Sequence, residues 1–108
     1  KAYRVQREVN ELIFEASVQN SAEDLSNLMK AYDIRRHSTR DKNGRSSLHY
    51  AAQHGSLGSA RVLLATGSDP WAEDDAGVIP FEVALKGKYF DAASMLLSAV
   101  LQQEPISR

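Results

Sequence analysis

The chain has 108 residues, of which 43% are hydrophobic and 25% charged, and its formal net charge is −1 at pH 7. This length bounds the fold to one domain with a modest core. The near-zero net charge supplies no field that would draw the chain to nucleic acid or to an anionic membrane, so we expect neither partner. The absence of Cys excludes a disulfide framework and thiolate metal sites.

No apolar run approaches the ~20 residues that a membrane-spanning helix needs, and no signal-peptide pattern opens the sequence. We therefore expect an intracellular protein, either cytoplasmic or nuclear. Because the chain begins at Lys1 without Met, we interpret it as a fragment of a larger protein.

Residues 1–20 are predicted to form one continuous helix, because apolar residues recur every three or four positions. These residues are Val5, Val9, Ile13 and Ala16. Asn10 could instead cap a new helix that begins there. Further along, Leu25 and Leu28 continue an apolar pattern at helical spacing.

The loop 33–43 that follows is strongly basic. Its cationic residues are Arg35, Arg36, His37, Arg40 and Lys42, with Arg45 just after it. One interpretation is a solvated loop that lies beside the acidic segment 73–75, since exposed ion pairs are common and contribute little. The other is a partner-binding surface. A phosphate backbone is a poor candidate for that partner, because the net charge is −1.

The segment 41–55 predicts a turn followed by a short helix. Asn43 and Gly44 form a strong turn dipeptide, because both tolerate positive φ. Ser46 can cap the next helix by accepting a bond from an early backbone N–H. Gly55 should end that helix.

A second helix should follow, with Ala60, Leu63 and Leu64 on its apolar face and Gly67 ending it in a left-handed conformation. One such unit of two helices cannot bury its apolar side alone, so stacked neighbours are needed.

The C-terminal third repeats this order. Pro80 suits the first position of a helix, and Gly87 should end that helix. The last helix should run from about 91 to 101 and pack on its neighbour through Ala93, Leu96, Leu97 and Val100. Four other residues then point partly elsewhere, namely Ala92, Met95, Ala99 and Leu101. We expect this end to pack against something, most simply a second copy of the chain in a homodimer through the C-terminal helix.

The segment 46–51 reads SSLHYA and resembles the T-P-L-H-x-A pattern of ankyrin repeats, with Ser in place of Thr and of Pro. A related unit aligns upstream and another downstream, where Phe14 and Glu82 replace the His. The resemblance implies an all-α solenoid of helix-turn-helix units joined by β-turn finger loops. Its ankyrin-repeat domain would span 1–101, with a helical extension 1–10, repeats at about 11–40, 41–73 and 74–101, and a flexible tail 102–108.

The resemblance also implies a protein-interaction module rather than an enzyme, with no cofactor and no metal. A protein or peptide partner would bind the concave face and the finger loops. The expected partner-binding residues are Arg36, Arg40, Lys42, Asn43, Arg45, Gln53, His54, Trp71, Asp75, Val78 and Lys86. The alternative is an accessory oligomerisation or regulatory domain attached to an enzyme, because the segment 80–85 is loosely similar to the C-terminal ankyrin region of glutaminases.

Three features were compared with a functional interpretation. Ser46 and His49 could suggest a nucleophile with its base, but no third orienting group is implied, and the resemblance assigns His49 to a structural bond between neighbouring turns. The three His residues lack the spacing of a helical metal pair. Trp71 either packs against a neighbouring loop or is an exposed anchor for a partner.

Overall fold

The computed structural model describes residues 11–31 and 40–103. Residues 11–18 are helical, and the helices that follow are α2 (Ala22–Ala31), α3 (Ser47–Gln53), α4 (Leu57–Ala65), α5 (Pro80–Lys86) and α6 (Phe90–Gln102). The described residues contain no strand. The predicted helix over 1–20 is therefore seen only in part, since its first ten residues lie outside the described ones.

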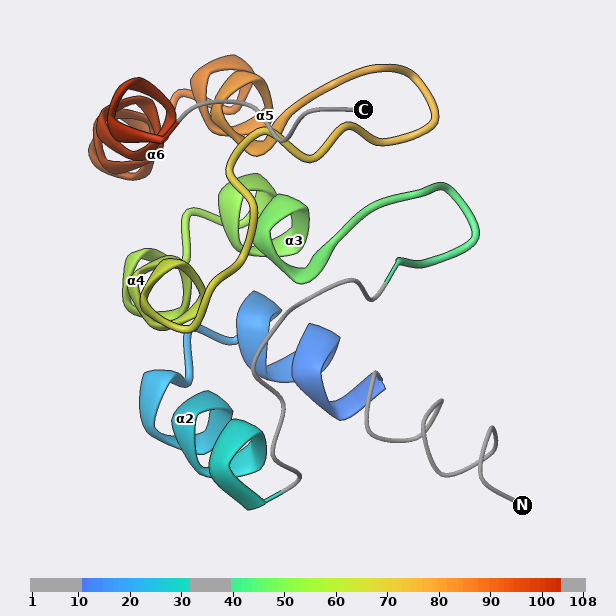
Figure 1. Cartoon of the computed structure of the whole chain (residues 1–108), viewed down its shortest axis with the longest axis vertical. Coiled ribbons are helices and arrows are strands. Elements are labelled where there is room, and N and C mark those ends of the chain that lie inside the picture. Colours follow the sequence, from blue (N-terminus) through green and yellow to red (C-terminus); the bar gives the residue numbers. More distant parts are fainter. Residues whose placement is uncertain (1–10, 32–39, 104–108) are drawn as a thin grey trace.

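The helices form three stacked pairs in two columns (Figure 1). The segment 11–18, α3 and α5 make one column, and α2, α4 and α6 make the other. Within the stack, α3 packs against both α4 and α5, and α4 packs against α2 and α6. The loops before α3 and α5 project from the first column as fingers. This arrangement confirms the predicted all-α solenoid of helix-turn-helix units with finger loops.

Local signals place the start of α3 where the sequence predicted it. Gly44 takes a positive φ of 76° in the turn of the preceding finger. Ser46 caps the helix reciprocally: its Oγ accepts from the His49 N–H at 3.3 Å, and its own N–H donates to His49 Nδ1 at 3.1 Å. Two orphan donors of the helix start are thereby satisfied. Pro80 occupies the first turn of α5, also as predicted.

The turn between the two helices of a pair is the same in all three units. A backbone bond closes it from Ser21 to the Ala16 carbonyl, from Ser56 to the Ala51 carbonyl, and from Tyr89 to the Ala84 carbonyl, at 3.1, 2.8 and 3.0 Å. Each turn needs one left-handed residue before its donor, and these residues are Asn20, Gly55 and Lys88, with φ of 57°, 64° and 64°.

Gly55 and Gly87 follow the ends of α3 and α5, as predicted, but Gly87 is not the left-handed residue of its turn. Gly87 has an ordinary φ of −79°, and the positive φ falls on Lys88. Lys88 is the residue that aligns with Gly55 in the repeat, and the closing bond between Tyr89 and Ala84 fixes the turn at that position. A nearby glycine does not move it.

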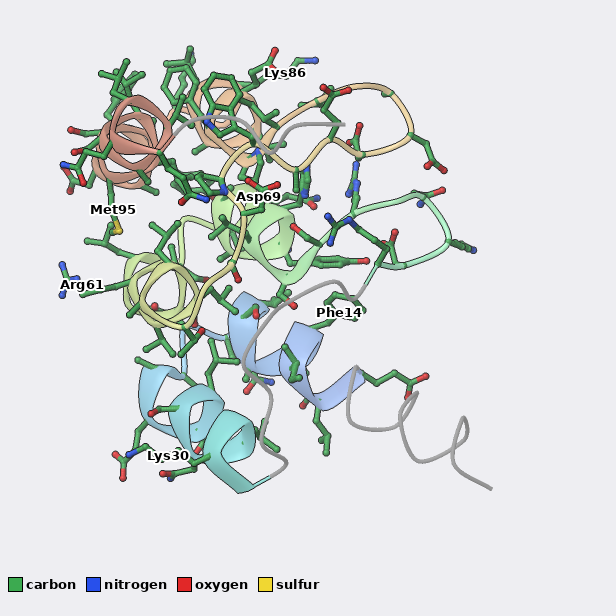
Figure 2. All side chains as sticks on the ribbon, in the orientation of Figure 1. Phe14, Lys30, Arg61, Asp69, Lys86 and Met95 are labelled. Atoms are coloured by element: carbon green, nitrogen blue, oxygen red, sulfur yellow. The ribbon has the colours of Figure 1, made fainter. Side chains whose placement is uncertain are left out.

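Each helix contributes at least one fully buried residue to a single core. These residues are Ile13, Leu25, Leu48, Leu63, Ala84 and Leu96. The expected face of α6 was partly wrong: Leu97 is 39% exposed, whereas Ala92 is buried. Met95 packs against the core and points from α6 toward α4 (Figure 2). The reason is that α6 packs on both α4 and α5, so its buried arc is wider than one stripe and turned toward α4.

Candidate functional site

Two fingers lie next to each other along one side of the stack. We call residues 41–45 finger A and residues 74–78 finger B. In finger A the Asp41 N–H donates to the Arg45 carbonyl at 3.0 Å, and the same bond joins Asp74 to Val78 in finger B at 3.0 Å. The Asp75 N–H of finger B donates to the Asn43 carbonyl of finger A at 3.0 Å. The fingers are thus tied internally and to each other.

An aspartate side chain organises finger A from within. Oδ1 of Asp41 accepts from the Asn43 N–H at 2.8 Å and from the Arg45 N–H at 2.9 Å, and Oδ2 accepts from the Tyr50 hydroxyl of α3. Partial burial alone would raise the pKa of Asp41. The hydrogen bond from Tyr50 and those from the two backbone N–H groups outweigh it and hold the pKa below its usual value.

Asp74 plays the same part in finger B. Its Oδ1 accepts from the Ala76 N–H at 2.8 Å and from the Val78 N–H at 3.0 Å. The hydrogen bond from Val78 is the main cause that lowers the pKa of Asp74. Both carboxylates therefore stay charged at neutral pH and fix the shape of their fingers.

His49 joins α3 to finger B. Its ring is buried, with 1% of the residue exposed. Nδ1 accepts from the Ser46 N–H, so the proton lies on Nε2, which donates to the Val78 carbonyl at 2.7 Å. Burial lowers the pKa of His49 below 6.5 and keeps the ring neutral. Both ring nitrogens are engaged, since Nδ1 also lies 2.8 Å from Ser46 Oγ, and the bond to Val78 confirms the predicted structural bond between neighbouring turns.

A groove opens between the two fingers and the ends of α3 and α5. Its volume is about 390 Å³, and it is lined by Arg45, Gln53, Asp74, Ala76, Val78, Val83, Lys86 and Gly87. The guanidinium of Arg45 donates to Gln53 Oε1 at 2.9 Å, which holds the cation at the wall of the groove. Val78 and Val83 supply apolar surface between charged groups of both signs.

The structure brings together part of the predicted partner-binding set. Arg45, Gln53, Val78 and Lys86 line the groove. The remaining described residues of the set, outside the groove, are Arg40, Lys42, Asn43, His54, Trp71 and Asp75, and all but Trp71 are exposed. Arg36 lies outside the described residues.

Sequence reasoning missed Asp74 and Val83 as lining residues. Asp74 was considered only as part of the acidic segment 73–75, although it aligns in the repeat with Asp41, which ends a basic loop and begins the matching turn. Val83 precedes Lys86 by three positions, and that spacing on α5 places both on one helical face. The two signals were present in the sequence.

Trp71 precedes finger B in the chain and contacts the C-terminal end of α6, outside the groove. Its backbone N–H donates to Asp69 Oδ1 at 2.9 Å, and its indole Nε1–H donates to the Gln103 carbonyl at 2.6 Å. The side chain is half-buried. These contacts favour the packing interpretation of Trp71.

Another cavity, of about 480 Å³, opens at the first unit, between the segment 11–19 and α2. Its charged lining residues are the exposed Glu15 and Asp24, with apolar surface from Leu12, Ala16 and Leu28.

Among the residues that the structure describes, no cluster of three or more His, Asp or Glu side chains is placed to hold a metal ion. Within the same residues, no helix is both long and apolar enough to cross a membrane.

Comparison with known proteins places the fold. The structure matches 278 solved chains. One of them comes from the structure described as the predatory endopeptidase Bd0816 from Bdellovibrio bacteriovorus in complex with immunity protein Bd3460. Its TM-score is 0.74 at 24% sequence identity, and the match covers 82% of this chain and 46% of that one. At this identity the likeness shows the fold alone.

No curated protein matches the sequence, so the likeness of the third unit to glutaminases stays a prediction. The family pattern described as ankyrin repeats (3 copies) matches residues 12–105. Ankyrin repeats are non-catalytic protein-interaction modules, and this chain belongs to the ankyrin-repeat family.

Proposed function

We propose that the chain binds a segment of a partner protein in the groove between finger A, finger B, α3 and α5. The observation that carries the proposal is the lining of this groove. Val78 and Val83 offer apolar surface, Arg45 is already oriented by Gln53, and Lys86 stands exposed at the edge. Apolar surface with a few placed polar groups is the usual make-up of a specific binding site.

The charges suggest what kind of segment fits. Arg45 and Lys86 favour an acidic side chain on the partner, whereas Asp74 has Oδ1 occupied by two backbone N–H groups of its own finger. An apolar side chain on the same partner segment would lie over Val78 and Val83. Burying one such side chain contributes about 1.5–3 kcal/mol, and a charge-assisted hydrogen bond to Arg45 contributes about as much.

Rigidity supports the proposal as well. The two fingers are closed by their own backbone bonds and tied to each other through Asn43 and Asp75, while His49 anchors finger B to α3. A surface that is ordered before binding loses little conformational entropy when the partner arrives. We propose the exposed Lys42, Asn43 and Asp75 at the fingertips as the polar rim of the interface.

His54, Arg36 and Arg40 of the predicted set are proposed as further contributors to binding. They rest on the sequence pattern of the concave face and of the basic loop. Trp71 also belongs to the predicted set. Because it bonds to Gln103, we expect it to influence partner binding by stabilising the fold rather than by touching the partner.

A peptide-display selection on the purified chain tests the groove. Enriched peptides should carry an acidic residue close to an apolar one, and they should lose affinity for Lys86→Glu and for Ala76→Arg. Both substituted residues are exposed, so the fold should be retained. Arg61→Glu is the matched control, since Arg61 points from α4 away from the stack (Figure 2). Peptides that bind the groove variants as tightly as the unchanged chain would refute the proposal.

The alternative role, an accessory oligomerisation or regulatory domain attached to an enzyme, would not need this groove. One observation favours oligomerisation over regulation as that role. The last helix pair carries exposed apolar side chains that the groove does not use.

A further inference from the structure

The outward side of α6 carries a stripe of large apolar side chains. Phe90 is 64% exposed, Leu97 39% and Leu101 77%. With 3.6 residues per turn, positions 90, 97 and 101 fall on one side of the helix. Leu85 of the neighbouring α5, 48% exposed, adds to the same apolar content. We call Leu85, Phe90, Leu97 and Leu101 the terminal face.

The terminal face points away from the stack. On α6, Ala93, Leu96 and Val100 are buried in the core, and Met95 points toward α4 (Figure 2). The stripe occupies the remaining side. Figure 1 shows α5 and α6 as the last pair of the stack, and no helix of the described residues lies beyond them.

Comparison with the middle unit shows what the terminal face lacks. Leu97 is the counterpart of Leu64 in the repeat alignment. Leu64 packs against the core and faces Met95 and Ala99 of α6 across a shallow cavity. In α6 the equivalent position, Leu97, has no such helix over it among the described residues. The terminal face therefore has the apolar composition of a packed surface, but no helix of the described residues covers it.

The composition of α6 suits a protein interface. Its sequence, FDAASMLLSAVLQ, holds a single charged residue, Asp91. The centres of protein interfaces are depleted in charge in this way. The apolar surface of the terminal face is of the order of 500 Å², at the upper end of what a monomer exposes and enough for the centre of an interface of ~800 Å² per partner.

The spacing along α6 fits a second copy of the same chain as the partner. The exposed residues along this side of α6 are Phe90, Ser94, Leu97 and Leu101, separated by steps of four, three and four, and Ser94 also borders the cavity between α6 and α4. This order reads the same in both directions. When two α6 helices lie antiparallel, Phe90 therefore meets the partner's Leu101, and the small Ser94 meets the partner's Leu97. Each large side chain faces an apolar or a small one.

We propose that the terminal face joins two copies of the chain about a two-fold axis, with α6 antiparallel to its counterpart near Ser94 and Leu97. One patch then covers itself, which is the requirement of a two-fold contact. The interface lies at the end of the stack and is independent of the proposed groove.

Sedimentation velocity over a series from about 1 μM to about 200 μM tests the association, because a dimer forms by mass action. The unchanged chain should shift from one chain mass to two. Phe90→Glu and Leu101→Glu should each raise the dissociation constant about tenfold or more. Leu12→Glu is the control, since Leu12 is also an exposed leucine but lies on the first helical segment. It should leave the dimer intact.

Circular dichroism on each variant checks that the fold is kept, which the exposure of these side chains favours. A chain that stays monomeric throughout the series overturns the proposal and leaves the face to another occupant, such as a further repeat. Species that grow beyond two chains overturn the two-fold contact. A dimer that survives both Glu substitutions overturns the assignment to the terminal face.

Cross-linking tests the antiparallel geometry separately. The chain has no Cys, so Ser94→Cys introduces one thiol close to the proposed axis. A short bis-maleimide should join two such chains rapidly. Lys30→Cys on α2, also exposed but at the opposite end of the stack (Figure 2), should give little product. Equal cross-linking of the two variants would contradict the proposed arrangement.

Discussion

Leu63 and Leu64 are adjacent leucines of α4. The sequence predicts both on the apolar face of the helix, but the structure buries them to different extents. Leu63 is fully buried, whereas Leu64 is half-buried against the edge of the core. Leu63→Ala removes a side chain that the core encloses, and such deletions cost about 3–5 kcal/mol through lost burial and the remaining cavity. Leu64→Ala opens toward a shallow surface cavity that water can fill, so we expect a loss of about 1–2 kcal/mol.

Urea denaturation followed by circular dichroism measures both losses. A chain of this length has a free energy of unfolding of roughly 5–15 kcal/mol. With a slope of about 1–3 kcal/mol per M urea, Leu63→Ala should lower the midpoint by about 1–5 M. Leu64→Ala should lower it by less than half as much. An equal or larger effect of Leu64→Ala would refute the assignment of the core, and with it the rotation of α4 in the stack.

Four further outcomes follow from the polar links and the turns. Burial holds the pKa of His49 in the folded chain below 6.5, so its contribution to stability is complete above about pH 6.5 and is lost as the pH falls toward the folded pKa. His49→Gln should therefore reduce the pH dependence of the free energy of unfolding below about pH 6.5, as measured by urea titration. Tyr50→Phe removes the hydroxyl that donates to Asp41 and should cost about 1 kcal/mol at pH 7, less once the pH falls through the lowered pKa of Asp41. Lys88→Gly should raise the free energy of unfolding by about 0.5–1 kcal/mol, because Lys88 has a φ of 64°; a loss of stability would contradict the turn geometry. Trp71→Phe should lower the melting temperature and leave the affinity of groove peptides unchanged, whereas the reverse result would restore Trp71 as an anchor for a partner.

Much of the fold was readable from local chemistry. Helix starts and turns depend on residues a few positions apart, so Ser46, Gly44 and Pro80 indicated their positions directly. The left-handed turn residue at Gly55 coincides with the helix end that the sequence predicted there, because Gly tolerates positive φ. It was missed at Lys88, because the closing hydrogen bond between Tyr89 and Ala84 sets the turn there and residue type does not.

The direction in which a helix faces was harder to predict. The pattern on α6 allows several apolar stripes, and which stripe is buried depends on the two helices that pack against it. Aligning Leu97 with Leu64 gave the correct position in the repeat but the wrong burial, because Leu64 has α6 beside it. The residues of the groove were predicted only in part, because their arrangement also depends on how neighbouring elements pack. Arg45 and Gln53 follow from the repeat alignment, but their direct bond across eight positions depends on how finger A meets α3.

The position of His49 shows how the three units are held together by different chemistry. In the middle unit the imidazole reaches the Val78 carbonyl of the next finger. In the first unit the same position is Phe14, whose ring lies 4.9 Å from that of Tyr50 in the next unit. In the third unit it is Glu82, which accepts from the Ile79 N–H at the start of its own helix at 3.3 Å.

A polar link between units is therefore replaced by an aromatic contact on one side of the middle unit, while Glu82 uses its side chain within its own helix. An unmade imidazole bond would leave a buried polar group unpaired, whereas Phe14 needs only apolar surface. The departures from the family pattern at Phe14 and Glu82 thus leave no unpaired imidazole at these positions. They also make the middle unit, with His49 and Leu63, the part of the stack on which both neighbours depend.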